Sequence, residues 1–398
     1  MAKETKTKIV NVTNAYGDKN TTAQILVQNK IKYTPKVSVI VPCYNVSLYI
    51  ERCLDSLINQ TLADIEIICV DDRSTDNTLQ IIQMYAKKDK RIKIIKHEVN
   101  KGVAVARNSA LDVAKGEYIG FVDPDDYVDT NFYEKLYNAV VSTNSIVAKA
   151  NVICFSNAVN DFVNYHSNEL IKRDILYFSS SFWSAIYNRK FLEKHSIRFP
   201  DEIRTAQDTV FLTMVTINTS AITFVEDTFY HYYYQREGSL DSHKLPHWKV
   251  ESKLNAFKLN LKYIEDSNLQ GDRKVLAIER HVVTHALYEC GAKVYENESD
   301  HRKMFSFLAD VIKQYPDITY MNKKTKEYFI QGRFTAFLSR KNLKRKRLYL
   351  FHFIPFIKID TVGSVVSVFL FDFLPIFKMV DNRKMYLFGI IPFIKIRG

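Results

Sequence analysis

Three aspartates crowd into the segment GFVDPDDYVD, which spans residues 120–129. Asp123, Asp125 and Asp126 directly follow the apolar run YIGFV, and carboxylates this close repel one another unless positive charge lies among them. Carboxylate oxygens are the ligands that hard divalent cations such as Mg²⁺ take. A solvated turn and a helix cap are the alternative interpretations. The strands and helices around the cluster decide among the three.

From residue 37 onward, β-branched runs alternate with amphipathic stretches of helix length. Strand, helix, strand repeated at this spacing predicts a parallel, doubly wound sheet with right-handed crossovers, which is an α/β fold. The predicted strands are 37–42, 65–72, 91–96 and 117–123, and the predicted helices are 47–60, 76–88 and 103–115.

Polar and acidic residues gather at the carboxyl ends of these predicted strands. The first strand ends at Pro42, the second in Asp71 and Asp72, and the fourth in the acidic cluster 123–126. Ligands of open parallel sheets bind at this edge of the sheet. The sequence therefore predicts a ligand site that the acidic cluster shares with the other strand ends.

Three segments in this order resemble the nucleotide-sugar-binding half of glycosyltransferase family 2, which has the GT-A fold: VSVIVPCYNVSLYIERCLDSLINQT, IICVDDRSTDNT and NKGVAVARNSALDVAKGEYIGFVDPDDYV. The resemblance is dense over about residues 36–130 and thinner to about 240. It implies an inverting, metal-dependent, non-processive bacterial enzyme. Such an enzyme moves a sugar from a nucleotide sugar, here a UDP-sugar, to a glycan or glycolipid acceptor in cell-surface polysaccharide or lipooligosaccharide synthesis.

The resemblance also implies which residues bind the donor. Pro42, Tyr44 and Asp72 match positions that hold the base and ribose, and a helix-capping or turn acid is the alternative interpretation of Asp72. Gly102 and Arg107, in NKGVAVARN, match a second donor-binding stretch. A purely structural salt bridge is the alternative for Arg107.

The acidic cluster matches the metal-binding motif of the same family. The resemblance implies that Asp125 ligates Mn²⁺ or Mg²⁺ directly and that Asp123 faces the ribose or joins the metal shell. A cation there stabilises the leaving nucleoside diphosphate as negative charge develops on it. Whether Asp126 also ligates the metal or only braces the loop stays open.

The remaining implied site residues lie in the second half of the sequence. Inversion requires a base for the proton of the acceptor hydroxyl, and Asp208 in AQDTVF matches the base of the family, with an ordinary helix N-cap as the alternative. Arg236 and Ser239, in YHYYYQREGSL, resemble a segment that closes over the donor. Trp183 is a candidate on the acceptor side, or else a core residue.

The two ends of the chain carry most of its positive charge. Lys and Arg outnumber Asp and Glu by 56 to 44 overall, by eleven to three in residues 341–398 and by seven to two in residues 1–36. The last segment also repeats one pattern three times, as YLFHFIPFIKI, FLFDFLPIFKM and YLFGIIPFIKI. Aromatic repeats rimmed by basic residues predict a surface for anionic membranes. A folded oligomerisation or core segment is the alternative.

Other features limit the compartment and the partners. Five cysteines, an odd number without CxxC spacing, argue against a disulfide framework or a zinc ribbon and favour a reducing compartment. The first residues lack the apolar core of a signal peptide. We expect a cytoplasmic protein, peripheral on the cytoplasmic face of the inner membrane. Nucleic acid is not an expected partner, because basic residues interleaved with aromatics along a groove are missing.

These observations divide the chain into five predicted segments. They are an N-terminal extension (1–35), the nucleotide-sugar-binding half (36–130), the acceptor-side half (131–240), a helical segment (241–340) and an amphipathic basic and aromatic tail (341–398). An inactive nucleotide-sugar-binding module and a peripheral membrane interaction protein are the alternative functions. The joint presence of Asp208 and Arg236 favours an enzyme.

Overall fold

The chain forms two compact units. Unit 1 comprises Met1–Ser242 and Glu251–Leu269, and unit 2 comprises His243–Val250 and Gln270–Gly398. The computed structural model describes residues 8–12, 21–28, 31, 33–156, 159–164, 166–233, 244–292, 294–321, 323–335, 337, 345–350, 354–362, 365–370, 374–380, 384–387 and 391–395.

Four parallel strands form the centre of unit 1. They run in the order β5 (Ile92–Lys96), β4 (Ile65–Asp71), β3 (Val37–Cys43) and β6 (Tyr118–Phe121). Every residue of β3 and β4 is buried, as expected for Val- and Ile-rich strands that helices cover on both faces. The predicted parallel α/β sheet is therefore confirmed.

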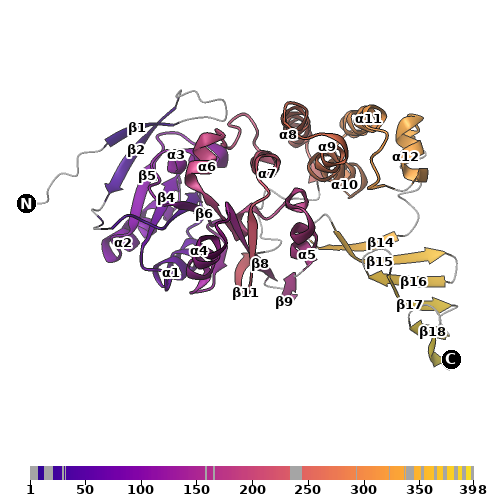
Figure 1. Ribbon diagram of the computed structural model, residues 1–398, viewed down its shortest axis with the longest axis horizontal. Coiled ribbons are helices and arrows are strands. Elements are labelled where there is room, and N and C mark those ends of the chain that lie inside the picture. The colour runs from indigo at the N-terminus through magenta and orange to yellow at the C-terminus, as the bar shows by residue number, and fades with distance from the viewer. Residues whose placement is uncertain are drawn as a thin grey trace, which may run out of the picture. The chain divides into compact units, whose positions relative to one another are not determined.

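The connecting helices cover the two faces of this sheet. Figure 1 shows α1 (Ile50–Ile58), α2 (Thr78–Lys88) and α4 (Phe132–Thr143) on one face and α3 (Val103–Leu111) on the other. This alternation follows from right-handed crossovers on either side of β3, where the strand order reverses. The reversal places the end of β3 between the ends of β4 and β6.

Helix α4 packs closely onto β6, just before the acidic cluster. A Cβ atom at Gly120 would lie 2.6 Å from the ring of Tyr133. Only glycine gives this ring room, and Tyr133 is fully buried against the strand. The close approach fixes the end of β6, from which the acidic loop starts.

Shorter strands extend the sheet beyond β6. Strand β10 (Ala185–Asn188) pairs antiparallel with β6 and with β8 (Val147–Ser156), and β11 (Ile222–Tyr233) runs parallel to β8. Strand β7 (Tyr127–Val128) pairs antiparallel with the end of β11, and β9 (Val159–Asn164) pairs with β8. This pairing brings the end of β11 to the segment that follows the acidic cluster.

The N-terminal extension contributes to the opposite edge of the sheet. Strands β1 (Lys8–Val12) and β2 (Thr21–Gln28) form an antiparallel pair, and β2 pairs antiparallel with β5. The described part of this extension is therefore a continuation of the central sheet.

The remaining elements of unit 1 enclose an aromatic core behind β6. They are α5 (His166–Arg173), the 3₁₀ turns η1 (Ile175–Tyr177) and η2 (Phe182–Ser184), α6 (Arg189–Lys194) and α7 (Gln207–Asn218). Phe121 packs against Phe182, Phe199 and Phe211 with ring centroids 5.3–5.6 Å apart. These contacts join β6, η2 and α7.

Helix α8 (His247–Glu265) supports the segment before α7. Within unit 1, the hydroxyl of Ser252 accepts hydrogen bonds from the backbone N–H groups of Arg204 and Thr205, both at 3.0 Å. Asn260 also donates to the hydroxyl of Thr209. Helix α8 therefore contacts both the residues before α7 and the first turn of α7.

Unit 2 is helical in its first part. It contains α9 (Gly271–Ile278), the π-helical turn η3 (Glu279–Val283), α10 (Thr284–Ala292), α11 (Glu298–Gln314), α12 (Lys323–Ile330) and the paired strands β12 (Lys244–Leu245) and β13 (Val294–Tyr295). Among the described residues, none of the helices is both long enough and apolar enough to span a membrane.

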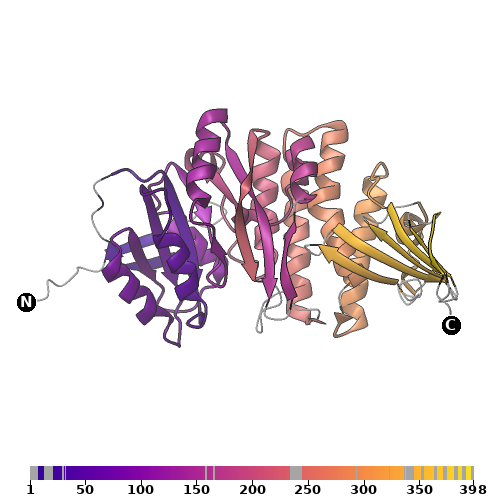
Figure 2. The same ribbon diagram turned by 90° about the horizontal axis from the view of Figure 1, so that it is seen from below.

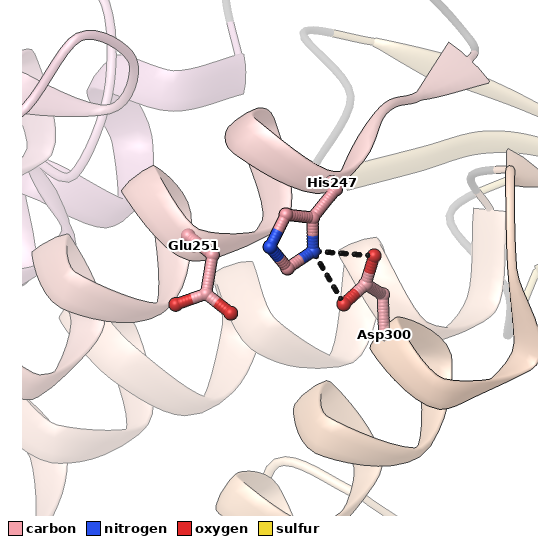
Figure 3. A group of neighbouring side chains, drawn as sticks. All are labelled: His247, Glu251 and Asp300. Carbon is pink, nitrogen blue, oxygen red and sulfur yellow. Dashed lines mark hydrogen bonds and ion pairs between the residues drawn. The ribbon is translucent and has the colours of Figure 1, made fainter.

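A buried carboxylate ties the start of α8 to the start of α11. Nδ1 of His247 lies 2.9 Å from Oδ1 of Asp300, and Glu251 follows His247 by one helical turn (Figure 3). Asp300 also accepts a hydrogen bond from Asn297 and lies 3.3 Å from the amine of Lys303. Because a lysine and two other donors already satisfy this carboxylate, it is a structural link between the two helices.

The C-terminal strands form one antiparallel sheet, shown in yellow in Figure 2. Its strands are β14 (Arg345–Leu350), β15 (Ile354–Val362), β16 (Val365–Leu370), β17 (Leu374–Val380), β18 (Lys384–Leu387) and β19 (Ile391–Lys395), in sequence order. In three hairpins an aromatic residue pairs with a proline beside a register shift: Tyr349 with Pro355, Phe369 with Pro375, and Tyr386 with Pro392. The sequence repeat is therefore a repeated β-hairpin.

Candidate active site

The acidic loop after β6 holds its last carboxylate inward. The backbone N–H of Asp126 donates to the carbonyl of Asp123 at 2.9 Å and closes a turn. The Asp126 carboxylate is 1% exposed and accepts hydrogen bonds from the Tyr230 hydroxyl (2.8 Å) and the Tyr233 backbone N–H (2.7 Å). Asp126 therefore braces the loop against β11.

Burial and like charge determine how Asp126 titrates. Burial raises the pKa of Asp126 well above its usual range, and the charges of Asp125 and Asp123 raise it further. Asp123 and Asp125 are only half-buried, so the two carboxylates that the sequence assigns to a metal are the more accessible ones of the cluster. The crowding of the three acids is thus divided between a buried group and two groups at the surface.

Arg107 supplies positive charge to this loop. From α3, its Nη2 donates to Oδ1 of Asp123 at 2.7 Å, and the guanidinium carbon lies 4.7 Å and 5.1 Å from the ring centroids of Phe182 and Phe199. The side chain is buried, and its Nε and Nη1 have no hydrogen-bond partner within the described part of the chain. The ion pair to Asp123 therefore uses only part of the hydrogen-bonding capacity of this guanidinium.

The same arginine acts on Asp208. Asp208 lies in the first turn of α7, directly after Ala206 and Gln207, and Ala206 has a left-handed backbone (φ 66°). Burial raises the pKa of Asp208, while the charge of Arg107 and the backbone N–H of Thr209 oppose that rise. A half-buried carboxylate with a raised pKa is suited to accept a proton near neutral pH.

Arg107 thus links two acids that are 85 positions apart in the sequence, Asp123 and Asp208. The first lies at the end of β6 and the second at the start of α7. The sequence assigned both to one site, and the structure brings both under the influence of one guanidinium. This shared positive charge, which forms an ion pair with Asp123 and lowers the pKa of Asp208, is the central feature of the site.

Asp72 is held by the loop that precedes α3. Its Oδ1 accepts hydrogen bonds from the backbone N–H of Lys101 and lies 2.7 Å from Nδ1 of His97, and its Oδ2 accepts from the N–H of Gly102. It is 3% exposed. Asp72 therefore shapes the loop before α3, where Gly102 has φ 90° and is the N-cap residue.

The sequence placed the neighbouring Asp71 at the same strand end without assigning it a role, and it did not single out His97. Oδ2 of Asp71 is buried and has no hydrogen-bond partner in the described residues, whereas Oδ1 accepts from the N–H of Ser74. His97 connects Asp72 to the hydroxyl of Ser109 on α3, at 2.8 Å from Nε2. Successive strand residues point to opposite faces, which was the available signal that Asp71 and Asp72 differ.

The other site residues from the sequence are in varied environments. Pro42 is buried within β3, and Tyr44 just after it is 47% exposed. Trp183 is buried and packs on Tyr230 with ring centroids 4.1 Å apart, so it supports the acidic loop. Arg236 and Ser239 lie outside the described residues.

The chain is similar to proteins of one enzyme family. Residues 38–202 match the family model described as glycosyl transferase family 2. The chain is 30% identical over 246 residues to a cholesterol galactosyltransferase of Borreliella burgdorferi, covering 57% of this chain and 68% of that protein. It is 30% identical over 293 residues to a poly(ribitol-phosphate) beta-glucosyltransferase of Bacillus spizizenii, covering 71% of this chain and 45% of that protein.

A solved structure supports the fold. The chain superposes on S. aureus TarS 1–349, crystallised in complex with UDP-GlcNAc, with a TM-score of 0.64 at 24% identity, covering 84% of this chain and 97% of that chain. The chain spans about half the length of two curated relatives that it matches: 55% of a glycosyltransferase of Bacillus subtilis and 45% of the Bacillus spizizenii protein.

Replacing Asp126 tests whether it is a brace or a ligand. In Asp126→Asn we expect Mn²⁺ affinity within about threefold of the wild type, because an amide oxygen still accepts from the Tyr233 N–H. We expect Asp126→Ala to lose about 1–3 kcal/mol of folding free energy, since two buried donors lose their acceptor. Metal titration and urea unfolding measure both effects.

The contribution of Asp126 to folding stability should depend on pH, because its pKa differs between the folded and unfolded states. Because the folded pKa of Asp126 is raised, its favourable contribution is complete below the unfolded pKa and is lost as pH rises through the folded pKa. Asp126→Asn does not ionise, so the free energy of unfolding of the wild type should fall relative to that of Asp126→Asn as pH rises from the unfolded pKa of about 4 toward the raised folded pKa. Loss of Mn²⁺ binding in a normally stable Asp126→Asn would instead make Asp126 a ligand.

Proposed function

The chain belongs to glycosyl transferase family 2, and we propose that it transfers a sugar from a UDP-sugar to a glycan or glycolipid acceptor. The transfer inverts the anomeric carbon and requires Mn²⁺ or Mg²⁺, and it serves cell-surface polysaccharide or lipooligosaccharide synthesis. The observation that carries the proposal is the position of Arg107, which donates to Asp123 and lowers the pKa of Asp208. The names of the relatives, which include a polymer glucosyltransferase and a sterol galactosyltransferase, support this acceptor class.

The acidic loop fits a hard divalent cation. Asp123 and Asp125 offer half-buried carboxylates on one turn, and such cations need only one or two protein ligands when phosphate and water complete the shell. Asp126, engaged by Tyr230 and Tyr233, is left out of this ligand set. When bound, the cation stabilises the negative charge of the leaving UDP.

Asp208 acts as the base in this proposal. Its carboxylate takes the proton of the acceptor hydroxyl while that oxygen bonds to the anomeric carbon and the bond to the diphosphate breaks. Burial raises the pKa of Asp208, which makes it a better base, and Arg107 keeps the pKa low enough for the ionised form to persist. The electron pair of the broken bond remains on UDP.

Arg107 also offers donors to the diphosphate. Its Nε and Nη1 are buried without a hydrogen-bond partner in the described residues, and a guanidinium binds phosphate oxygens with paired N–H groups. Tyr44, half-exposed after β3, offers a ring for the nucleobase, and Pro42 is buried two residues before it. Asp72 acts indirectly by holding Gly102, while Asp71 offers the buried acceptor oxygen for the nucleoside. Arg236 and Ser239 complete the proposed donor set.

Two substitutions separate binding from chemistry. In Asp208→Asn we expect UDP release from the preferred UDP-sugar to fall about 10²- to 10⁴-fold, the usual contribution of a general base. The affinity for UDP with Mn²⁺ should stay within about threefold. In Asp125→Asn both activity and Mn²⁺-dependent UDP affinity should fall. A panel of UDP-sugars with Mn²⁺ or Mg²⁺, followed by UDP detection, measures the activity.

Asp227→Asn is the matched control, because Asp227 is an exposed acid that pairs with Lys135 on the surface. It should leave both readouts unchanged. Wild-type activity in Asp208→Asn would remove the base assignment, and unchanged metal dependence in Asp125→Asn would remove the metal assignment.

We further propose that residues 341–398 bind the anionic cytoplasmic face of the inner membrane, so that the enzyme is a peripheral cytoplasmic protein. Two observations support this proposal. The segment forms three equivalent hairpins, and it contains eleven basic but only three acidic residues. Each juxtamembrane Lys or Arg contributes about 1 kcal/mol of attraction to an anionic surface. Aromatic and aliphatic repeats add interfacial affinity.

Vesicle sedimentation tests this surface. The full chain should sediment with phosphatidylglycerol vesicles and less with phosphatidylcholine vesicles, and salt should weaken the binding because it screens charge. A chain ending at Lys341 should remain in the supernatant. Equal sedimentation of both chains would exclude the membrane role, and loss of a dimer in the shorter chain would favour oligomerisation.

A further inference from the structure

The 3₁₀ turn η2 contacts two supports of the acidic loop and one buried lysine through three consecutive residues. The ring of Phe182 lies against the guanidinium of Arg107, the indole of Trp183 packs on Tyr230, and the hydroxyl of Ser184 accepts a hydrogen bond from the amine of Lys149 at 2.6 Å. The turn therefore joins Lys149, on β8, to groups around the proposed metal site.

Two of these neighbours hold the same aspartate. Arg107 donates a hydrogen bond to the carboxylate of Asp123. The hydroxyl of Tyr230 accepts a hydrogen bond from the backbone N–H of Asp123 at 3.0 Å and donates one to the carboxylate of Asp126. Any shift of Phe182 or Trp183 changes the packing of one of these neighbours. The position of η2 thus influences both the side chain and the backbone of Asp123.

The turn needs support from outside. Its N-cap residue, Ser181, has a left-handed backbone with φ 59°, a conformation that costs a non-glycine residue of order 1 kcal/mol or more. Within the turn, the hydroxyl of Ser184 donates to the Ser181 carbonyl at 2.8 Å. The same hydroxyl accepts from Lys149, so the amine stabilises the hydrogen bond that closes the strained turn.

Lys149 is an unusual residue for a core. It is 1% exposed, and its amine lies 5.0 Å from the ring centroid of Phe178. The hydrogen bonds of the amine in the described residues go to the Ser184 hydroxyl at 2.6 Å and to the Ala150 carbonyl at 3.4 Å, and neither acceptor is a carboxylate. Burial lowers the pKa of Lys149 to about 7. An apolar residue of similar size would pack here without the desolvation cost of an amine, so its one short hydrogen bond, to Ser184, indicates a specific task.

We propose that Lys149 is a positioning residue for metal-dependent donor binding, because its amine fixes η2 and thereby the two groups that hold Asp123. The inference rests on the proposed function. It adds to that function a residue on β8 that contacts neither the donor nor the metal.

The proposal separates stability from binding. Lys149→Met removes a buried ionisable amine, so the Tm should stay the same or rise. Ser184 then loses its donor and η2 loosens, so the affinity for UDP in the presence of Mn²⁺ should fall about fivefold, the change expected for one lost hydrogen bond. A residue that only fills the core would not weaken binding while the Tm is maintained.

Calorimetric titration of the full chain with UDP and Mn²⁺, together with thermal unfolding, tests this. Ser184→Ala is the second variant and should weaken binding to a similar degree. Lys93→Met is the matched control, because Lys93 is another buried lysine but pairs with Glu66 at 3.1 Å. It should lower the Tm, since Glu66 loses its partner, and leave UDP affinity unchanged.

The possible results distinguish failure of the positioning role of Lys149 from failure of the proposed function. Binding by Lys149→Met and Ser184→Ala within twofold of the wild type would overturn the positioning role and leave the proposed function standing. Equal weakening in Lys93→Met would also overturn it, because the effect would then follow general destabilisation. A wild type that binds no UDP with Mn²⁺ would overturn the proposed function and the inference with it.

Discussion

The ion pair of Arg107 with Asp123 is the interaction on which the rest of the site depends. It joins α3 to the loop after β6 at 2.7 Å, and the same charge opposes the rise that burial imposes on the pKa of Asp208. A buried guanidinium is costly unless its donors are used. Here one donor holds an acid, and the buried Nε and Nη1 have no partner in the described residues.

The three crowded acids of the loop, Asp123, Asp125 and Asp126, are accommodated because each has a different environment. Asp126 is buried and receives hydrogen bonds from β11, Asp123 pairs with Arg107, and Asp125 remains half-buried. Like charges so close would otherwise destabilise the fold. Tyr230 connects these arrangements, because its one hydroxyl binds both the Asp126 carboxylate and the Asp123 backbone.

Much of the scaffold could be predicted because it follows from local pattern and chain topology. The periodicity of residues 37–123 predicted β3 to β6 and α1 to α3, and the carboxyl ends of parallel strands necessarily meet at one edge. The acidic loop was therefore placed correctly at the end of β6. The two N-terminal strands that extend the sheet carried no such repeating pattern.

The side-chain contacts could not be predicted in the same way. Asp126 depends on Tyr230, 104 positions away, and Asp72 is satisfied by His97 and the loop before Gly102. Such partners are set by tertiary packing, which no local window contains. Lys149 shows the same limit, because a lysine inside an apolar strand pattern does not indicate that Ser184 will lie beside its amine.

The most direct test of the account is the pH dependence of UDP release, measured as kcat/KM for the wild type, Arg107→Lys and Arg107→Gln. Because Arg107 lowers the pKa of Asp208, removing its charge should move the acid limb of the profile to higher pH in Arg107→Gln. Arg107→Lys, which keeps the charge, should retain the wild-type position of that limb at reduced activity. An acid limb at the same pH in all three proteins would contradict the claim that Arg107 couples the acidic loop to the base.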